Sequence, residues 1–166
     1  HVAAEQCQKG DIMVVSPVSR SELGYFGDLL GTLLIARGVR GLIIDAGCRD
    51  VADLERMKFP VWSRSICAHG TVKETLGDVN TTISCGDQVV NAGDIIVADD
   101  DGVVVVPRKD ATRVLEAAEA RERREDDIRK RYESGDLGLD MHNMRPRLAE
   151  KGLTYVEQTD HNTHKD

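Results

Sequence analysis

The sequence predicts an α/β protein with a mixed system of β-sheets, and three observations support this prediction. Short apolar segments typical of strands alternate with helical patterns in the first part of the chain. Several short strands then follow one another without helices between them, and a long helix comes next. The 166 residues suffice for one domain with its own core. We therefore expect a single domain over residues 1–157 and a polar, disordered tail at 158–166.

The individual elements follow from apolar periodicity and from turn residues. Residues 1–8 have the composition of the end of a helix, and the leucines between Gly24 and Gly38 predict a helix whose regular part starts at Asp28. Strands are expected at 12–16, 41–45, 61–64, 82–84, 88–90, 94–98 and 103–106, with a strand-like segment at 154–157. Further helices are expected at 51–57, 111–133 and 141–151.

Two features of the third quarter of the chain have specific interpretations. The four valines at 103–106 predict a strand that is buried on both faces. The acidic run 99–102 before them has neither the alternating spacing nor the distal glutamate of an EF-hand calcium loop. We therefore expect a turn between two strands there.

Composition and charge exclude several classes of protein. The net charge is −7 and the basic residues are interleaved with acidic ones, which argues against a nucleic-acid partner. No apolar run is long enough to span a membrane. The four cysteines have no CxxC spacing, which argues against a structural zinc site or a disulfide framework. We expect a cytoplasmic protein with reduced thiols and no membrane partner.

Three charged residues are expected to meet at one place. Asp28 stands at the start of a predicted helix, and Arg49 and Asp50 follow a predicted strand. Ligands of β-α-β units collect at the carboxyl ends of strands and at helix N termini. The backbone amides of Leu29 and Leu30, in the first turn of the helix, are free to bind an anion there.

This set of groups fits the chemistry of a 2-oxo acid. A carboxylate such as Asp50 can hold Mg²⁺ or Mn²⁺, which polarises a keto oxygen as a Lewis acid. Arg49 can stabilise an enolate, and Asp28 can orient metal-bound waters or relay a proton. The helix N terminus can hold the carboxylate of the 2-oxo acid. Spacing alone leaves open a simpler interpretation, in which Asp28 caps the helix and the other two residues form a surface ion pair.

The pattern Asp28, twenty intervening residues, Arg49 and Asp50 resembles the D-x20-R-D pattern of the class II 4-hydroxy-4-methyl-2-oxoglutarate / 4-carboxy-4-hydroxy-2-oxoadipate aldolases. The similarity extends over residues 1–157, through the segments GYFGDLLGTLLIARGVRGLIIDAGCRD, FPVWSR, GTVKETLGDVN, NAGDIIVADDDGVVVVP and MRPRLAEKGLTYVE. The run DDDGVVVVP is shared more widely, by the superfamily of the regulator of ribonuclease activity A.

The resemblance implies a fold, an assembly and a role for each site residue. The fold would be an α/β/β/α sandwich with mixed sheets, similar to swivelling domains, in homotrimers or homohexamers. Family members begin upstream of His1, so the aldolase domain is expected to lack its N-terminal segment here. The implied roles are metal ligation by Asp50, enolate stabilisation by Arg49, water binding by Asp28, pyruvate binding at Gly27, Leu29 and Leu30, and a water-mediated metal contact from Glu125 of a neighbouring subunit.

Glu125 can also be examined by periodicity. On the predicted helix 111–133 it lies seven residues after Ala118 and three before Ile128, which places it on the apolar stripe. A carboxylate on a packed face is costly unless it is paired or close to a metal. Arg121 and Arg124 are close enough in sequence to pair with it, so both interpretations stay open.

The expected function is therefore that of a metal-dependent pyruvate aldolase, a carbon–carbon lyase of aromatic compound degradation. It would cleave a 4-hydroxy-2-oxo acid to pyruvate and a second 2-oxo acid, with oxaloacetate decarboxylation as a side activity. Two alternatives remain. One is a non-enzymatic regulator that binds a ribonuclease, and the other is an enzyme whose main activity is oxaloacetate decarboxylation.

Overall fold

The computed structural model describes residues 1–156, which fall into two compact units. The first unit is His1–Val114 and the second begins at Leu115. The single domain expected over 1–157 stays a prediction, and the expected tail at 158–166 lies outside the described residues.

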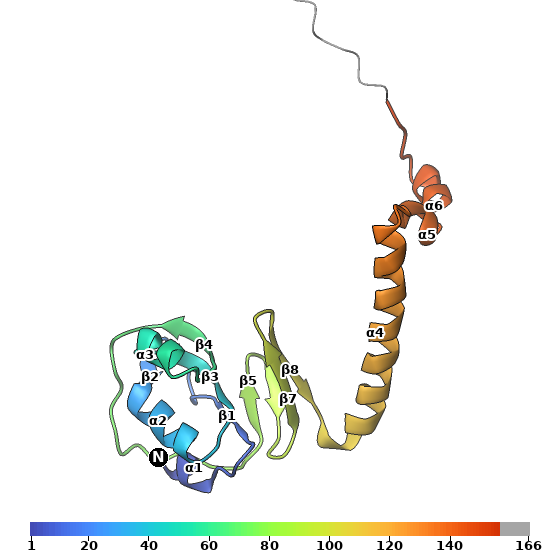
Figure 1. Cartoon of the computed structure of the whole chain (residues 1–166). Helices are drawn as coiled ribbons and strands as arrows, with labels where there is room; N and C mark the ends of the chain where they lie inside the picture. Colours follow the sequence, from blue (N-terminus) through green and yellow to red (C-terminus); the bar gives the residue numbers. More distant parts are fainter. Residues whose placement is uncertain (157–166) are drawn as a thin grey trace, which may run out of the picture. The chain divides into compact units, whose positions relative to one another are not determined.

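A parallel four-stranded sheet forms the centre of the first unit (Figure 1). Its strands are β1 (Ile12–Val15), β2 (Gly24–Phe26), β3 (Gly41–Cys48) and β4 (Val61–Ile66). Strand β3 is central: β1 pairs with its first half, β2 pairs with its last residues, and β4 pairs along its full length. The carboxyl ends of β2 and β3 therefore lie side by side.

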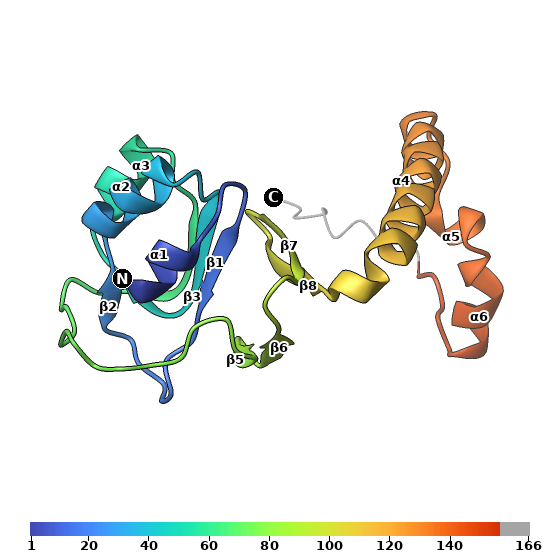
Figure 2. The same ribbon diagram turned by 90° about the horizontal axis from the view of Figure 1, so that it is seen from below.

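Three helices cover one face of this sheet, α1 (Val2–Gln6), α2 (Asp28–Ala36) and α3 (Val51–Arg56), as Figure 2 shows. Alternate residues of β3 point to the same face, so Leu42, Ile44 and Ala46 all contribute to the core beneath the helices. Leu34 of α2 and Leu54 of α3 fill that core from the helical side. This core fixes the helices against the sheet, with the first residues of α2 and α3 following the ends of β2 and β3.

Two antiparallel hairpins face the opposite side of the sheet. They are formed by β5 (Ile83–Cys85) with β6 (Gln88–Val90) and by β7 (Ile95–Asp99) with β8 (Gly102–Val106). Ile43, which points away from the helices, packs with Cys85 and Val90 in a second core. An open cavity of about 910 Å³ remains between the sheet and the hairpins. The α/β class predicted from the sequence is confirmed, with parallel and antiparallel sheets in separate layers.

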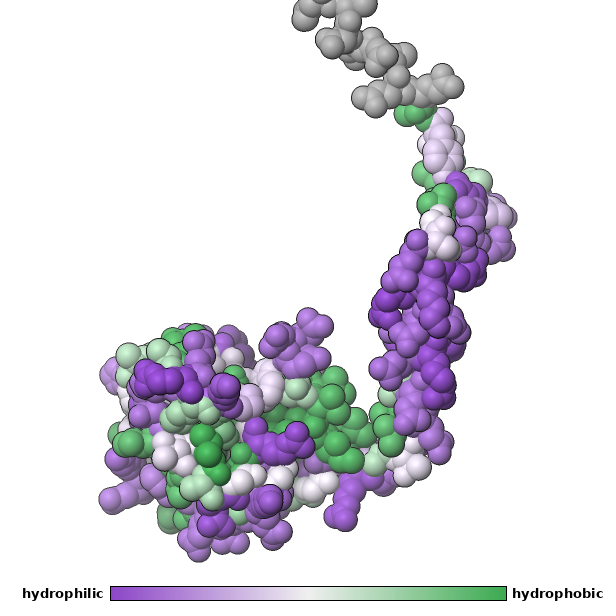
Figure 3. All heavy atoms as spheres, in the orientation of Figure 1, coloured by the Kyte–Doolittle hydropathy of each residue, from purple (hydrophilic) through white to green (hydrophobic). Residues whose placement is uncertain are grey.

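The outer face of the β7–β8 hairpin corrects one prediction. Val97 and Val104 are 58% and 59% exposed, although the valine run was expected to be buried on both faces. In Figure 3 the surface over this hairpin is largely hydrophobic. The turn expected at 99–102 is confirmed, because Asp101 donates its N–H to the Asp99 carboxylate at 2.9 Å within the hairpin.

The Asp45 carboxylate forms an ion pair within the central sheet and also a hydrogen bond to the first hairpin. Asp45 of β3 accepts a hydrogen bond from Arg64 Nε at 2.6 Å and a second one from the backbone N–H of Gly86 at 3.1 Å. The two side chains are only 19% and 29% exposed. Burial raises the pKa of the neighbouring Cys85 thiol, and the Asp45 carboxylate raises that pKa further. The Cys85 side chain is therefore expected to stay a neutral thiol at physiological pH.

Asp45→Asn is expected to lower the free energy of unfolding by about 1–3 kcal/mol, because the hydrogen bonds that it weakens involve a charged, half-buried partner. Urea denaturation followed by circular dichroism measures this loss. Asp53→Asn is the matched control, since the pair of Asp53 with Arg56 is more exposed and is expected to contribute less than about 1 kcal/mol. Equal losses in the two variants would contradict this account of the link.

The second unit contains most of α4 (Ala111–Glu133), then α5 (Gly138–Met141) and α6 (Met144–Glu150). No residue of α4 is buried among the described residues, and its surface is mostly hydrophilic (Figure 3). Ion pairs spaced three or four residues apart stabilise the helix, among them Arg129 with Asp126 at 2.5 Å. In residues 1–156, no helix combines the length and the apolarity needed to cross a membrane.

Most element predictions are confirmed to within a few residues, and three need correction. The helix expected over Gly24–Gly38 is a strand, β2, followed by α2 from Asp28. The helix expected at 141–151 is two short helices, α5 and α6. The strand-like segment at 154–157 has no strand in its described residues, 154–156.

Candidate functional site

Two parallel strand–turn–helix connections bring the predicted site residues together. Strand β2 leads through Gly27 into α2, and β3 leads through Arg49 and Asp50 into α3. Phe26 pairs with Cys48 at the carboxyl ends of the two strands, and the N–H of Arg49 donates to the Phe26 carbonyl at 2.8 Å. The two turns are therefore adjacent, as the sequence predicted.

Asp50 links the two turns through its carboxylate. Its Oδ2 accepts a hydrogen bond from the backbone N–H of Asp28 at 3.2 Å and lies 3.5 Å from Arg49 Nε. Its Oδ1 has no hydrogen-bond partner among residues 1–156, and the side chain is 34% exposed. One oxygen of the carboxylate is thus anchored, and the other is available to a ligand.

Arg49 is held by the backbone of β2. Its Nη1 donates to the Gly24 carbonyl at 2.5 Å, and Gly24 in turn donates its N–H to the His69 carbonyl at 2.8 Å. Within the described part of the chain, Arg49 Nη2 has no acceptor. The guanidinium is therefore fixed at one end and can donate to an anion at the other.

The N terminus of α2 offers free backbone donors beside Arg49 and Asp50. The first hydrogen bond of the helix is from Gly31 N–H to the Gly27 carbonyl, at 3.1 Å. The amides of Leu29 and Leu30, which precede it, have no acceptor among residues 1–156. Asp28 does not cap the helix, because the N-cap residue is Gly27 and no side chain caps it. The capping interpretation of Asp28 is therefore wrong, whereas the contact of Arg49 with Asp50 agrees with the ion-pair alternative.

The carboxylates near the two turns offer few ligands for a divalent metal. No group of three His, Cys, Asp or Glu side chains in residues 1–156 is arranged to hold a metal ion. Mg²⁺, however, keeps several of its waters and is usually bound by one or two carboxylates together with its substrate. The free oxygen of Asp50 fits such a sparsely ligated ion, and Asp28 is the first residue of α2 on the adjacent connection.

Glu125 belongs to α4, in the second unit. Its carboxylate pairs with Arg121 Nε at 2.6 Å, and its side chain is 51% exposed. The stripe predicted from periodicity is not a buried face within the described chain, and pairing with Arg121, the simpler alternative, is present. Its contact with a neighbouring subunit's metal stays a prediction.

Sequence reasoning missed the contribution of Gly24, whose carbonyl holds Arg49. The segment Gly24–Phe26 was assigned to a helix because it precedes the regular leucine spacing of α2. Two adjacent aromatic residues between glycines are typical of a short strand, and this signal could have identified β2. With β2 recognised, the role of the Gly24 carbonyl beside Arg49 could have been inferred.

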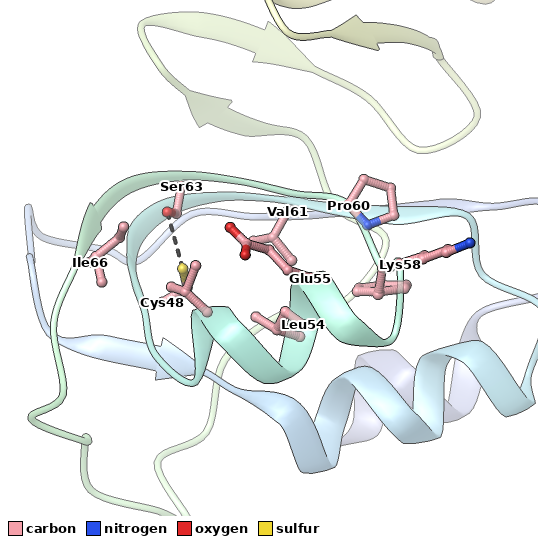
Figure 4. A pocket seen from close by; sticks show the side chains of 10 residues that line it. Cys48, Leu54, Glu55, Lys58, Pro60, Val61, Ser63 and Ile66 are labelled. Atoms are coloured by element: carbon pink, nitrogen blue, oxygen red, sulfur yellow. Dashed lines mark hydrogen bonds between the residues drawn. The ribbon is translucent and has the colours of Figure 1, made fainter.

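A small open pocket of about 390 Å³ adjoins the site on the side of α3 and β4. Cys48 and Val51, which flank the Arg49 and Asp50 pair in sequence, both line it. Figure 4 shows Cys48 beside Ser63, whose hydroxyl lies 3.3 Å from the thiol sulfur. The residues that line the pocket are predominantly apolar, and Glu55 of α3 is also among them.

The comparisons with known proteins agree with this fold. A family model described as RraA-like, Aldolase/RraA, matches residues 1–105. Among solved structures, a Pseudomonas syringae pv. tomato protein of uncharacterized function has a TM-score of 0.77 at 28% identity, over 84% of this chain and 70% of that one. Streptomyces coelicolor RraAS2, described as an unusual member of the RNase ES inhibitor RraA protein family, has a TM-score of 0.70 at 28% identity, over 78% of this chain and 67% of that one.

Two curated relatives are similar in sequence. An uncharacterized protein of Methanocaldococcus jannaschii is 34% identical over 123 residues, 74% of this chain and 59% of the relative. A protein of Halalkalibacterium halodurans, named "Putative 4-hydroxy-4-methyl-2-oxoglutarate aldolase", is 29% identical over 135 residues, 81% of this chain and 64% of the relative. The chain thus spans about three fifths of the length of these relatives. The family match covers most of the chain, and the protein therefore belongs to the RraA-like Aldolase/RraA family.

Proposed function

We propose that this protein is a divalent-metal-dependent aldolase that releases pyruvate from a 4-hydroxy-2-oxo acid. The substrate would be 4-carboxy-4-hydroxy-2-oxoadipate or 4-hydroxy-4-methyl-2-oxoglutarate. The observation that carries the proposal is the convergence of Arg49, the free Asp50 oxygen and the free α2 amides at adjacent turns. The names of relatives such as the Halalkalibacterium protein support the same reaction class.

Different groups of this chain would bind the carboxylate and the keto oxygen of the substrate. The amides of Leu29 and Leu30, with the backbone at Gly27, would hold the 2-oxo carboxylate at the positive end of the helix. Asp50 would hold Mg²⁺ or Mn²⁺, which supplies Lewis-acid polarisation of the 2-keto oxygen when bound. Arg49 would donate from Nη2 to the same oxygen as negative charge develops there.

The reaction would break the bond between C3 and C4 of the substrate. The 4-hydroxyl loses its proton as C4 becomes a carbonyl, and the electron pair of the broken bond forms the pyruvate enolate. Asp28 would orient the water that carries the proton between these positions, and protonation of C3 would complete the pyruvate. Decarboxylation of oxaloacetate passes through the same enolate, so it is part of the proposal as a side activity.

The proposal also includes a neighbouring copy of the chain. The homotrimer or homohexamer implied by the family resemblance would bring Glu125 of one subunit to the metal waters of another. The exposure of Glu125 and of the whole of α4 among the described residues is compatible with such a contact. Exchange of its present partner, Arg121, for the metal waters would be required.

We expect the protein to release pyruvate from 4-carboxy-4-hydroxy-2-oxoadipate in the presence of Mg²⁺, and to lose this activity with EDTA, because Asp50 alone cannot polarise the keto oxygen. Coupling pyruvate to lactate dehydrogenase and following NADH measures the release. Restoration by Mg²⁺ or Mn²⁺ after EDTA is the control. A full-length protein that released no EDTA-sensitive pyruvate from either proposed substrate would refute the proposal.

A second candidate function is a non-enzymatic regulator that binds a ribonuclease. It is favoured by the structural similarity to Streptomyces coelicolor RraAS2, which is described as an unusual member of an RNase inhibitor family. A pure binding module has no need for a free carboxylate oxygen beside free amides. Binding to a ribonuclease without metal-dependent turnover would favour this alternative.

A further inference from the structure

The side chains of Arg49 and Asp50 pack against two glycines, Gly24 and Gly27, where a side chain would leave too little room for them. An ideal Cβ at Gly24 would be 3.3 Å from Arg49 Cβ and would overlap the Cys67 carbonyl oxygen. An ideal Cβ at Gly27 would be 3.1 Å from both Cγ and Nε of Arg49 and would overlap Asp50 Oδ2.

We propose that Gly27 is a positioning residue for Asp50: its missing side chain leaves the space in which Oδ2 reaches the Asp28 amide, so that Oδ1 is presented to a ligand. The distances carry this assignment. Oδ2 accepts from Asp28 N–H at 3.2 Å, and it would be the first atom to meet a side chain at position 27. The assignment concerns the same site as the proposed aldolase, and its metal-binding consequence rests on that proposed function.

The backbone at Gly27 does not require glycine. Its φ of −155° and ψ of −172° describe an extended conformation that any residue adopts. The need for glycine therefore comes from the carboxylate of Asp50 and the stem of Arg49. Gly24 differs, because a side chain there would meet the backbone of Cys67, which cannot move aside without disturbing the loop.

This difference makes Gly27→Ala a selective probe of the Asp50 carboxylate. The new methyl group would collide with the tip of a side chain, which can rotate away, so the fold is expected to persist. Rotation would break the hydrogen bond from Asp28 and turn Oδ1 from its present direction. Alanine is also a poorer N-cap residue than glycine, so a small loss of stability is expected whatever Gly27 does, and stability is not the readout.

Gly31→Ala is the matched control. It lies on the same helix, and its new methyl group would also meet only side-chain tips, those of Leu54 at 2.9 Å and Met57 at 3.0 Å. Leu54 reaches Asp50 only through the backbone, where its N–H donates to the Asp50 carbonyl at 3.0 Å. Neither Leu54 nor Met57 contacts the Asp50 carboxylate among the described hydrogen bonds and ion pairs. Both variants add one methyl group to α2 or its cap, but only Gly27→Ala displaces the carboxylate.

We expect Gly27→Ala to weaken Mn²⁺ binding by about 10- to 100-fold, the effect of removing an interaction that orients a metal ligand, whereas Gly31→Ala keeps the wild-type affinity. Electron paramagnetic resonance of free Mn²⁺ during titration of the complete protein measures the affinity. Crystal structures of the wild type and Gly27→Ala, both without metal, report the separation between Asp28 N and Asp50 Oδ2, which is expected to exceed hydrogen-bond distance in the variant.

The two measurements separate the positioning role from the proposed function. If Asp50 Oδ2 still accepts the Asp28 N–H in Gly27→Ala, or if the variant binds Mn²⁺ as the wild type does, the positioning role is overturned. If the wild type itself binds no Mn²⁺, metal ligation by Asp50 fails, while the crystal structures still decide whether Gly27 sets the position of its carboxylate.

Discussion

Asp50→Asn is expected to abolish metal-dependent release of pyruvate, with a loss of about 10³-fold or more in kcat/KM. Asparagine adopts the left-handed backbone conformation that Asp50 has, at φ 58° and ψ 36°, so the loop should persist. Its amide oxygen can still accept the Asp28 N–H, but it carries no charge with which to hold Mg²⁺. Without the metal, the developing enolate loses its largest electrostatic stabilisation. The lactate dehydrogenase assay measures the loss.

Asp53→Asn is the control for this substitution as well. Asp53 lies one turn further along α3, where it pairs with Arg56 at 2.6 Å, and it has no contact with Arg49 or Asp28 in the described hydrogen bonds. Wild-type kcat/KM is therefore expected for this variant. An Asp50→Asn variant with more than about a hundredth of wild-type activity would contradict direct metal ligation by Asp50, since loss of a direct ligand is expected to cost more than the 10- to 100-fold typical of an orienting group.

Leu42→Ala is expected to lower the free energy of unfolding by about 3–4 kcal/mol. Leu42 is completely buried in the central strand β3, under the helices, and its removal would leave a cavity in the core. The strand also pairs on both edges at this residue, which limits the collapse that could fill the cavity. Urea denaturation, analysed for both midpoint and slope, measures the loss.

Leu76→Ala is the matched control for the core variant, because Leu76 is 99% exposed. The same three side-chain carbons are removed in both variants, so the difference between them isolates burial. A change within about 0.5 kcal/mol is expected for an exposed position of this kind. Comparable losses at the two positions would mean that β3 is not at the centre of the cooperative unit.

The sequence predicted that Asp28, Arg49 and Asp50 lie close together, but it did not predict the strand β2 beside them. The spacing of Asp28, Arg49 and Asp50 identified two turns that prove to be adjacent. The strand β2 was missed because three residues pair with only the end of β3, and a segment that short carries little periodicity of its own. The same pairing extends β3 to Cys48, beyond the predicted end at 45.

Tertiary context explains the other differences. The valines of β8 have the apolar character of a buried strand, but one face of their hairpin has no covering layer within the described chain. Glu125 lies on the stripe that periodicity indicates, yet no residue of α4 is buried there. In both cases the sequence reports what a segment can bury, whereas burial itself depends on a partner surface that periodicity does not specify.

The left-handed conformation of Asp50 has a consequence for how this fold can change its role. Of the two acidic amino acids, aspartate tolerates that conformation better than glutamate, so the backbone favours the shorter carboxylate before any ligand is considered. Asparagine and glycine fit the same conformation without a charge. A lineage can therefore gain or lose the acid at this position while it keeps the loop intact. One scaffold can in this way carry catalytic members and members that only bind other proteins.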